Sequence, residues 1–160
     1  MNVPTSVSIV GLILIALGCG SPEPSGSLDW FIDEAMVRGI EYRHVSGFDG
    51  NYRIPEITGS GAALADLDGD GDLDAYIVQS GSLVVPSQAT DQVYFNRGDG
   101  YFDRGESPPD GDGYGMGVTA GDYDNDGDVD LYVTNIGSNL LLQNDGKGNF
   151  QNVASAAGVA

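Results

Sequence analysis

Residues 66–74 read DLDGDGDLD and residues 122–130 read DYDNDGDVD, so one nine-residue pattern occurs twice in the chain. In each copy an aspartate stands at every second position, and a glycine follows the third aspartate. Such a segment presents carboxylate oxygens at regular intervals, and its glycine permits the left-handed backbone that a tight turn needs. The pattern therefore predicts two acidic loops of the same shape.

The spacing of these aspartates favours calcium sites, because Ca²⁺ takes about six to eight oxygen ligands in a flexible geometry. Within a loop, the first three aspartates and the last are expected to supply carboxylates, and the fourth a backbone carbonyl. The predicted ligands are Asp66, Asp68, Asp70, Asp72 and Asp74 in the first loop, and Asp122, Asp124, Asp126, Asp128 and Asp130 in the second. The sequence thus predicts two Ca²⁺ sites.

Other interpretations of the loops are a bare acidic turn, a magnesium site and an EF-hand. Aspartate and glycine favour turns with or without a metal, but carboxylates about 4 Å apart repel by roughly 4 kcal/mol per pair at an effective dielectric constant near 20. Magnesium prefers a strict octahedron that retains waters. An EF-hand needs a glutamate at its twelfth loop position, where this chain has Ile77 and Val133.

The similarity between the two copies extends beyond the loops. Each loop is followed by β-branched and aromatic residues, AYIVQ (75–79) or LYVTN (131–135), which are typical of strands. Further on, each copy contains N-x-G-x-G-x-F, at residues 96–102 and 144–150, which is typical of a tight hairpin. The sequence predicts an all-β fold of about two β-propeller blades, each with four antiparallel strands and the acidic loop between the first and second strands.

Three segments, residues 55–78, 113–135 and 140–159, resemble the FG-GAP/VCBS-type repeat proteins, and within them the secreted group related to cartilage acidic protein. The resemblance implies a β-propeller, as in the integrin α-subunit head, with calcium in the loop between the first and second strands of a blade. The repeats span about residues 56–104 and 112–152. Because a propeller needs roughly four to eight blades, residues 28–160 are interpreted as the N-terminal part of a longer propeller, or as a unit that associates with its own copies.

The N-terminus carries an apolar run at residues 7–17. It is shorter than the roughly 20 residues that a membrane-spanning helix needs, and it fits the core of a signal peptide over residues 1–18. Residues 16–19, ALGC, resemble a bacterial lipobox, which predicts lipid attachment at Cys19; an ordinary secretory signal cut near Gly18 is the alternative. Residues 19–27 form a Pro/Ser/Gly-rich linker. We expect an exported protein, either a bacterial outer-membrane or cell-surface lipoprotein or a secreted one.

The formal net charge of −18 argues against nucleic-acid binding and against docking on anionic lipid. Contact with a membrane is therefore expected only through a lipid at Cys19. The single histidine, His44, has no cysteine partner nearby, and no catalytic residue is predicted. The expected function is a non-catalytic extracellular module that binds a glycan or a protein. The alternative is the propeller portion of a secreted polysaccharide-degrading enzyme whose catalytic site lies outside this chain.

Overall fold

The structure is a computed structural model that describes residues 31–85 and 87–160. The predicted signal peptide, the linker and the predicted lipid-attachment residue Cys19 lie outside the described residues. Residues 33–160 form one compact unit. Within the described ranges, no helix combines the length and apolar character that crossing a bilayer requires.

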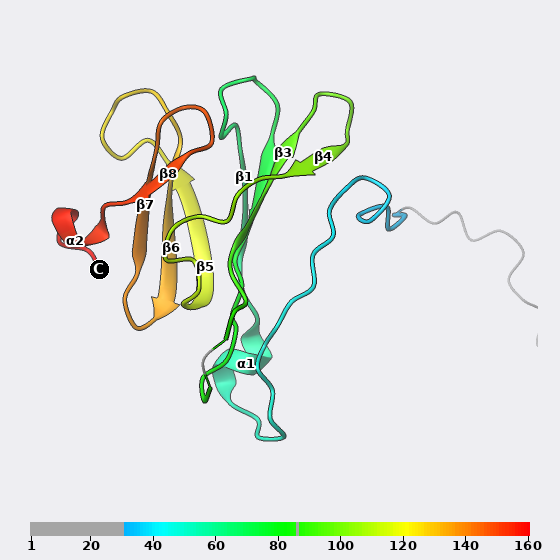
Figure 1. Cartoon of the computed structure of the whole chain (residues 1–160), viewed down its shortest axis with the longest axis vertical. Helices are drawn as coiled ribbons and strands as arrows, with labels where there is room; N and C mark the ends of the chain where they lie inside the picture. The colour runs from blue at the N-terminus through cyan, green and yellow to red at the C-terminus, as the bar shows by residue number, and fades with distance from the viewer. Residues whose placement is uncertain (1–30, 86) are drawn as a thin grey trace, which may run out of the picture. The chain divides into compact units, whose positions relative to one another are not determined.

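Two antiparallel sheets of four strands make up this unit (Figure 1). The first sheet contains β1 (Ala62–Ala65), β2 (Asp74–Ile77), β3 (Gln92–Asn96) and β4 (Phe102–Arg104), and the second contains β5 (Tyr114–Gly121), β6 (Asp130–Ile136), β7 (Leu140–Asn144) and β8 (Phe150–Asn152). In both sheets each strand pairs with the next strand of the chain. The prediction of four antiparallel strands per repeat is confirmed.

Two short helices, α1 (Ile54–Thr58) and α2 (Ala154–Ala157), were not predicted. Pro55 presets the backbone angle φ in the first turn of α1, and the Glu56 carboxylate accepts a hydrogen bond from Arg53 N at 3.4 Å. The α2 helix ends at Gly158 in the left-handed conformation, with φ of 73°. Local capping therefore creates a helical turn in segments that lack helical periodicity.

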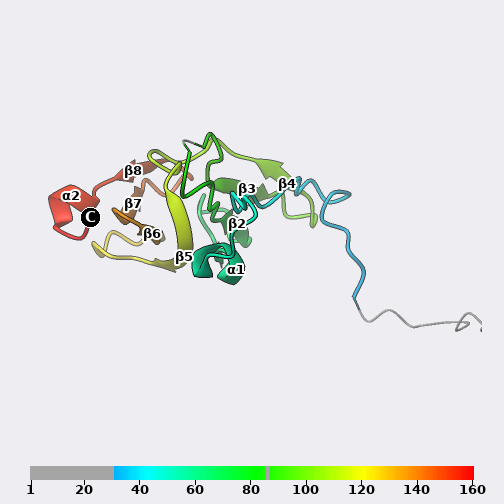
Figure 2. The ribbon, with the colours of Figure 1, turned by 90° about the horizontal axis from the view of Figure 1, so that it is seen from below.

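The hydrophobic core lies between the two sheets. Side chains on one face of the first sheet, such as Tyr76 and Val93, pack in one cluster with Leu131 and Leu142 of the second sheet. Burying side chains of this kind contributes about 1.5–3 kcal/mol each. β1 and β5 lie in contact where the sheets meet, and Figure 2 shows the two sheets from below, with β5 next to the first sheet. The two repeats thus share a core.

The N-x-G-x-G-x-F segments form the turns between β3 and β4 and between β7 and β8. Arg97 N donates to Tyr101 O at 2.9 Å in the first turn, and Asp145 N donates to Asn149 O at 3.2 Å in the second. The glycines in these turns have positive φ, for example 78° at Gly98. In Figure 1 both turns lie at the same end of the sheets as the β1–β2 and β5–β6 loops.

Candidate functional site

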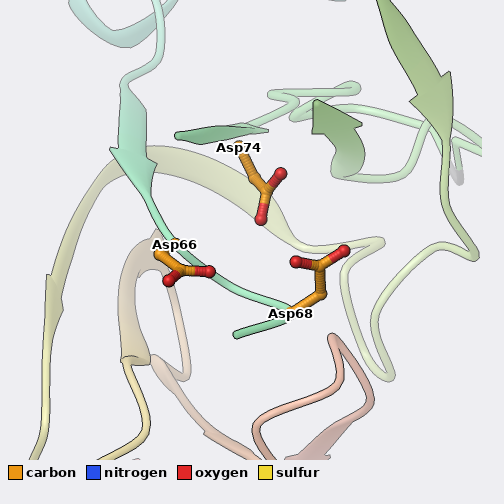
Figure 3. Close-up of side chains that lie close together, drawn as sticks. All are labelled: Asp66, Asp68 and Asp74. Carbon is orange, nitrogen blue, oxygen red and sulfur yellow. The ribbon is translucent and has the colours of Figure 1, made fainter. Parts of the chain in front are cut away.

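The two acidic segments connect β1 to β2 and β5 to β6. Each brings three carboxylates together, with one oxygen from each side chain within 4.8 Å of the others. Figure 3 shows the first group, in which the side chains face a common space. The groups are Asp66, Asp68 and Asp74 in the first loop, and Asp122, Asp124 and Asp130 in the second.

The side chain of the first aspartate in each pattern accepts hydrogen bonds from backbone amides of its own loop. The carboxylate of Asp66 accepts hydrogen bonds from Gly69 N at 2.8 Å and from Gly71 N at 3.0 Å. Asp122 does the same with Asn125 N and Gly127 N, at 2.7 and 3.1 Å. Donor and acceptor of each of these bonds belong to the same loop, so the bonds stabilise the turn of the loop backbone locally.

The last aspartate of each pattern is buried and links its loop to the neighbouring hairpin. Asp74 is 0 % exposed; its Oδ2 accepts from Leu67 N and its Oδ1 from Asn96 N, both at 2.8 Å. Asp130 accepts the equivalent bonds from the amides of Tyr123 and Asn144. Burial raises the pKa of Asp74 above its ordinary value, because a charged carboxylate is disfavoured away from water.

The middle member of each group differs in its surroundings. Partial burial, followed by the charges of Asp74 and Asp70, raises the pKa of Asp68. In the second loop, Asp124 Oδ2 accepts a hydrogen bond of 2.6 Å from Gln143 Nε2. At the position equivalent to Gln143 the first repeat has Phe95, which offers no such donor. The two groups are therefore similar in geometry and unequal in their hydrogen bonds.

The other predicted ligands stand outside these two groups. Asp70 Oδ1 accepts from Asp72 N at 2.9 Å, and Asp126 repeats this bond with Asp128 N. The Asp72 carboxylate lies against the turn between β3 and β4. Its Oδ2 is 2.9 Å from the position that a Cβ atom on Gly98 would occupy. Asp128 lies in the same way against Gly146. The structure thus brings together six of the ten predicted side chains.

The arrangement suits a hard divalent cation. Its donor atoms are carboxylate oxygens only, and each group carries three formal negative charges when ionised. Backbone carbonyls of the same loops supply further oxygen atoms of the kind that Ca²⁺ accepts. The residues present therefore fit the predicted ion.

Sequence reasoning missed three residues that position these groups: Asn96, Asn144 and Gln143. The two asparagines are equivalent positions of N-x-G-x-G-x-F, and their recurrence marked them only as turn residues. Their backbone amides hold Asp74 and Asp130. The nearest signal was that one such asparagine follows each loop, 22 residues after Asp74 and 14 residues after Asp130. Because these distances differ, the spacing did not identify the asparagines as partners of the loops.

Residues 66–133 match the family model of the FG-GAP-like repeat. The match begins at the first aspartate of the first loop and extends into β6, so it includes both acidic loops. This repeat is a structural module of the β-propeller type, and the two four-stranded sheets agree with it. No functionally curated protein matches the chain.

Proposed function

We propose that this chain is an exported calcium-binding repeat module that acts by binding a partner and not by catalysis. The observation that carries the proposal is the repeated grouping of three aspartate carboxylates at one end of two equivalent sheets. Ca²⁺ accepts the irregular geometry of a loop, whereas Mg²⁺ requires a near-ideal octahedron. Each loop would hold one ion, with the grouped carboxylates as its central ligands.

The remaining ligands of each proposed site come from the same loop. Asp70 and Asp126 would add carboxylates, and Asp72 and Asp128 would add backbone carbonyls, as the spacing predicts. A bound cation removes the repulsion between the grouped carboxylates. It also stabilises the folded state by about 2.7 kcal/mol per site when free calcium exceeds the dissociation constant about a hundredfold.

The proposal is tested by thermal unfolding of the full chain, followed by circular dichroism, with excess calcium and with a chelator. We expect calcium to raise the midpoint in the wild type and to leave it unchanged in a variant with both Asp68→Ala and Asp124→Ala. A variant with Asp99→Ala and Asp103→Ala removes two exposed carboxylates outside the loops and should respond like the wild type. Equal wild-type midpoints in calcium and chelator would contradict the proposal.

We also propose that the sheets are blades of a β-propeller. Within the FG-GAP-like repeat proteins, we propose that the chain is related to the secreted group of cartilage acidic protein. The partner is proposed to be an extracellular glycan or protein. Support comes from the repeat match and from the net charge of −18, which opposes binding to nucleic acid.

The surface of the second sheet supports a proposal for this assembly. In the first sheet, Ala63, Tyr76 and Val93 are paired neighbours in one row, and the second sheet packs against it. The equivalent row of the second sheet, called the open row, consists of Thr119, Tyr132 and Leu141. It lines a hollow of about 210 Å³.

We propose that another four-stranded sheet of this type covers the open row. The proposal rests on the equivalence of the two rows. The row in the first sheet is covered by a four-stranded sheet, so a similar sheet is expected to cover the equivalent row in the second sheet. In a solution of the 160-residue chain, we expect the covering sheet to come from a second copy of the chain.

A further inference from the structure

Asn144 lies between the two acidic loops and contacts both of them. It is 4 % exposed. Its side-chain Nδ2 donates to Leu67 O, in the first loop, at 2.8 Å and to Val129 O, in the second, at 3.0 Å. Its backbone amide donates to Asp130 Oδ1 at 2.8 Å. One residue of β7 therefore holds a carboxylate of the second group and the backbone of the first loop.

The path continues inside the first loop. Leu67, whose carbonyl accepts from Asn144, uses its own amide to donate to Asp74 Oδ2 at 2.8 Å. Leu67 stands between Asp66 and Asp68, and it is 1 % exposed. An unbroken series of buried groups thus connects a carboxylate of the first group with a carboxylate of the second.

We infer that Asn144 couples the two loops, so that a divalent cation bound in one loop strengthens binding in the other. The inference rests on the proposed function, because it concerns the same two groups of carboxylates. It adds a positioning residue and a property, cooperativity, that the loops taken singly do not have.

The physical reason is the burial of the connecting groups. A buried donor or acceptor that loses its partner is not compensated by water, so the loops favour arrangements that keep the bonds to Asn144. A cation that fixes Asp130 also fixes the Asn144 backbone, and with it the donor to Leu67 O. The first loop then has less disorder to lose when it binds its own ion, which is positive coupling. Coupling between two sites is commonly about 5- to 150-fold in affinity and is reciprocal.

The first repeat supplies a matched control at Asn96. Asn96 N donates to Asp74 Oδ1 at 2.8 Å, and Asn96 Nδ2 donates to Leu73 O at 3.3 Å. Its Oδ1 accepts from Gly98 N at 3.1 Å. These partners all belong to the first repeat, so Asn96→Ala removes a comparable side chain without removing a bond between the loops.

The test is isothermal titration calorimetry with calcium chloride on two forms of the full chain. One form has an intact second loop, and in the other Asp124→Ala disables that loop. With Asn144 present, we expect the first loop to bind calcium about tenfold more tightly when the second loop is intact. Asn144→Ala should reduce that ratio to about one, and Asn96→Ala should leave it at about ten. A ratio near one in the wild type, or a ratio that survives Asn144→Ala, would overturn the inference.

A second measurement does not depend on the folding of Asn144→Ala. In Asp68→Ala the first loop is disabled and Asn144 is retained. We expect calcium bound to the second loop to slow hydrogen exchange of the Leu67 amide in this variant, and unchanged exchange would contradict the coupling. If the wild type binds no calcium, the proposed function and the inference both fail. Binding to two independent loops would leave the proposed function standing and overturn only the coupling.

Discussion

At the scale of the residue, the last aspartate of each pattern has a structural role that does not depend on a cation. Asp74 is fully buried and accepts two backbone amides. In Asp74→Ala the buried amide of Leu67 and the partly buried amide of Asn96 lose their acceptor, and each unsatisfied group costs about 1–3 kcal/mol. We expect a loss of roughly 2–5 kcal/mol in the free energy of unfolding, measured by urea denaturation in chelator.

Asp70→Ala is the matched control for that measurement. Asp70 belongs to the same loop, and its side chain accepts one exposed amide, that of Asp72. Its loss should lower the free energy of unfolding by less than about 1 kcal/mol. If both substitutions lowered the free energy of unfolding equally, the burial of Asp74 would not explain its contribution to stability.

Asp91 is a buried carboxylate far from the acidic loops in sequence. It is 2 % exposed; its Oδ1 accepts from Gln79 N at 2.6 Å and its Oδ2 from Tyr76 Oη at 2.7 Å. Burial raises the pKa of Asp91 to about 6 from an ordinary value of 3.8. Burial also raises the pKa of the nearby hydroxyls of Tyr76 and Tyr42. Asp91 is therefore the group of this cluster that titrates between pH 4 and 8.

The sign of the pH dependence follows from the raised pKa of Asp91. The folded protein binds this proton more tightly than the unfolded chain, so its contribution is complete below about pH 4 and is lost as the pH rises through about 6. Two pKa units correspond to about 3 kcal/mol. Asp91→Asn does not titrate, so its free energy of unfolding relative to the wild type should increase by about that amount from pH 4 to pH 8. Urea denaturation in chelator measures this difference, and a difference independent of pH would contradict the assignment.

At the scale of the element, β5 approaches the first sheet through glycine. A Cβ added to Gly115 would overlap the side chain of Val78 and stand 2.9 Å from Gln79 O. Overpacking of this kind costs about 1–3 kcal/mol, so Gly115→Ala should lower the free energy of unfolding by that amount. Gly121→Ala, in the same strand, meets no atom within 4 Å and should be neutral or slightly stabilising. Equal effects in urea denaturation would contradict the close packing of β5.

The elements that the sequence predicted are those in which local residue types determine the backbone. Strands follow the acidic loops because β-branched and aromatic residues are concentrated there, and the hairpins follow from glycines that require positive φ. The α1 helix was missed because five residues are too few to show helical periodicity.

The candidate site was predicted only in part, for a related reason. The spacing identified the ten aspartates, but the division into grouped and ungrouped carboxylates depends on which backbone amides each one accepts. The contact between Asn144 and Leu67 joins residues of different repeats. Such a contact is fixed by the packing of one sheet on another, which a repeat pattern in the sequence does not specify.

At the scale of the whole molecule, two equivalent sheets have different surroundings, and this asymmetry predicts association. In such an association we expect the open row of one copy to face Ala62, Ile77 and Gln92 in the first sheet of another copy. These three residues are the first-sheet equivalents of Val118, Val133 and Leu140. Contacts that join one end of a copy to the other end of the next are heterologous, and they generate rings or open chains.

The prediction is that the chain associates in a concentration-dependent manner, measured by sedimentation velocity over a range of protein concentrations. Thr119 is exposed at the β5 end of the open row, so Thr119→Arg introduces a charge that a covering sheet would have to bury unpaired. This variant should sediment as a monomer at concentrations where the wild type does not. Gln88→Arg makes the same charge change at an exposed position in the connection between β2 and β3 and should behave like the wild type. A wild-type chain that stays monomeric throughout would overturn association of copies through the open row, and loss of association in both variants would assign it to net charge instead of to this face.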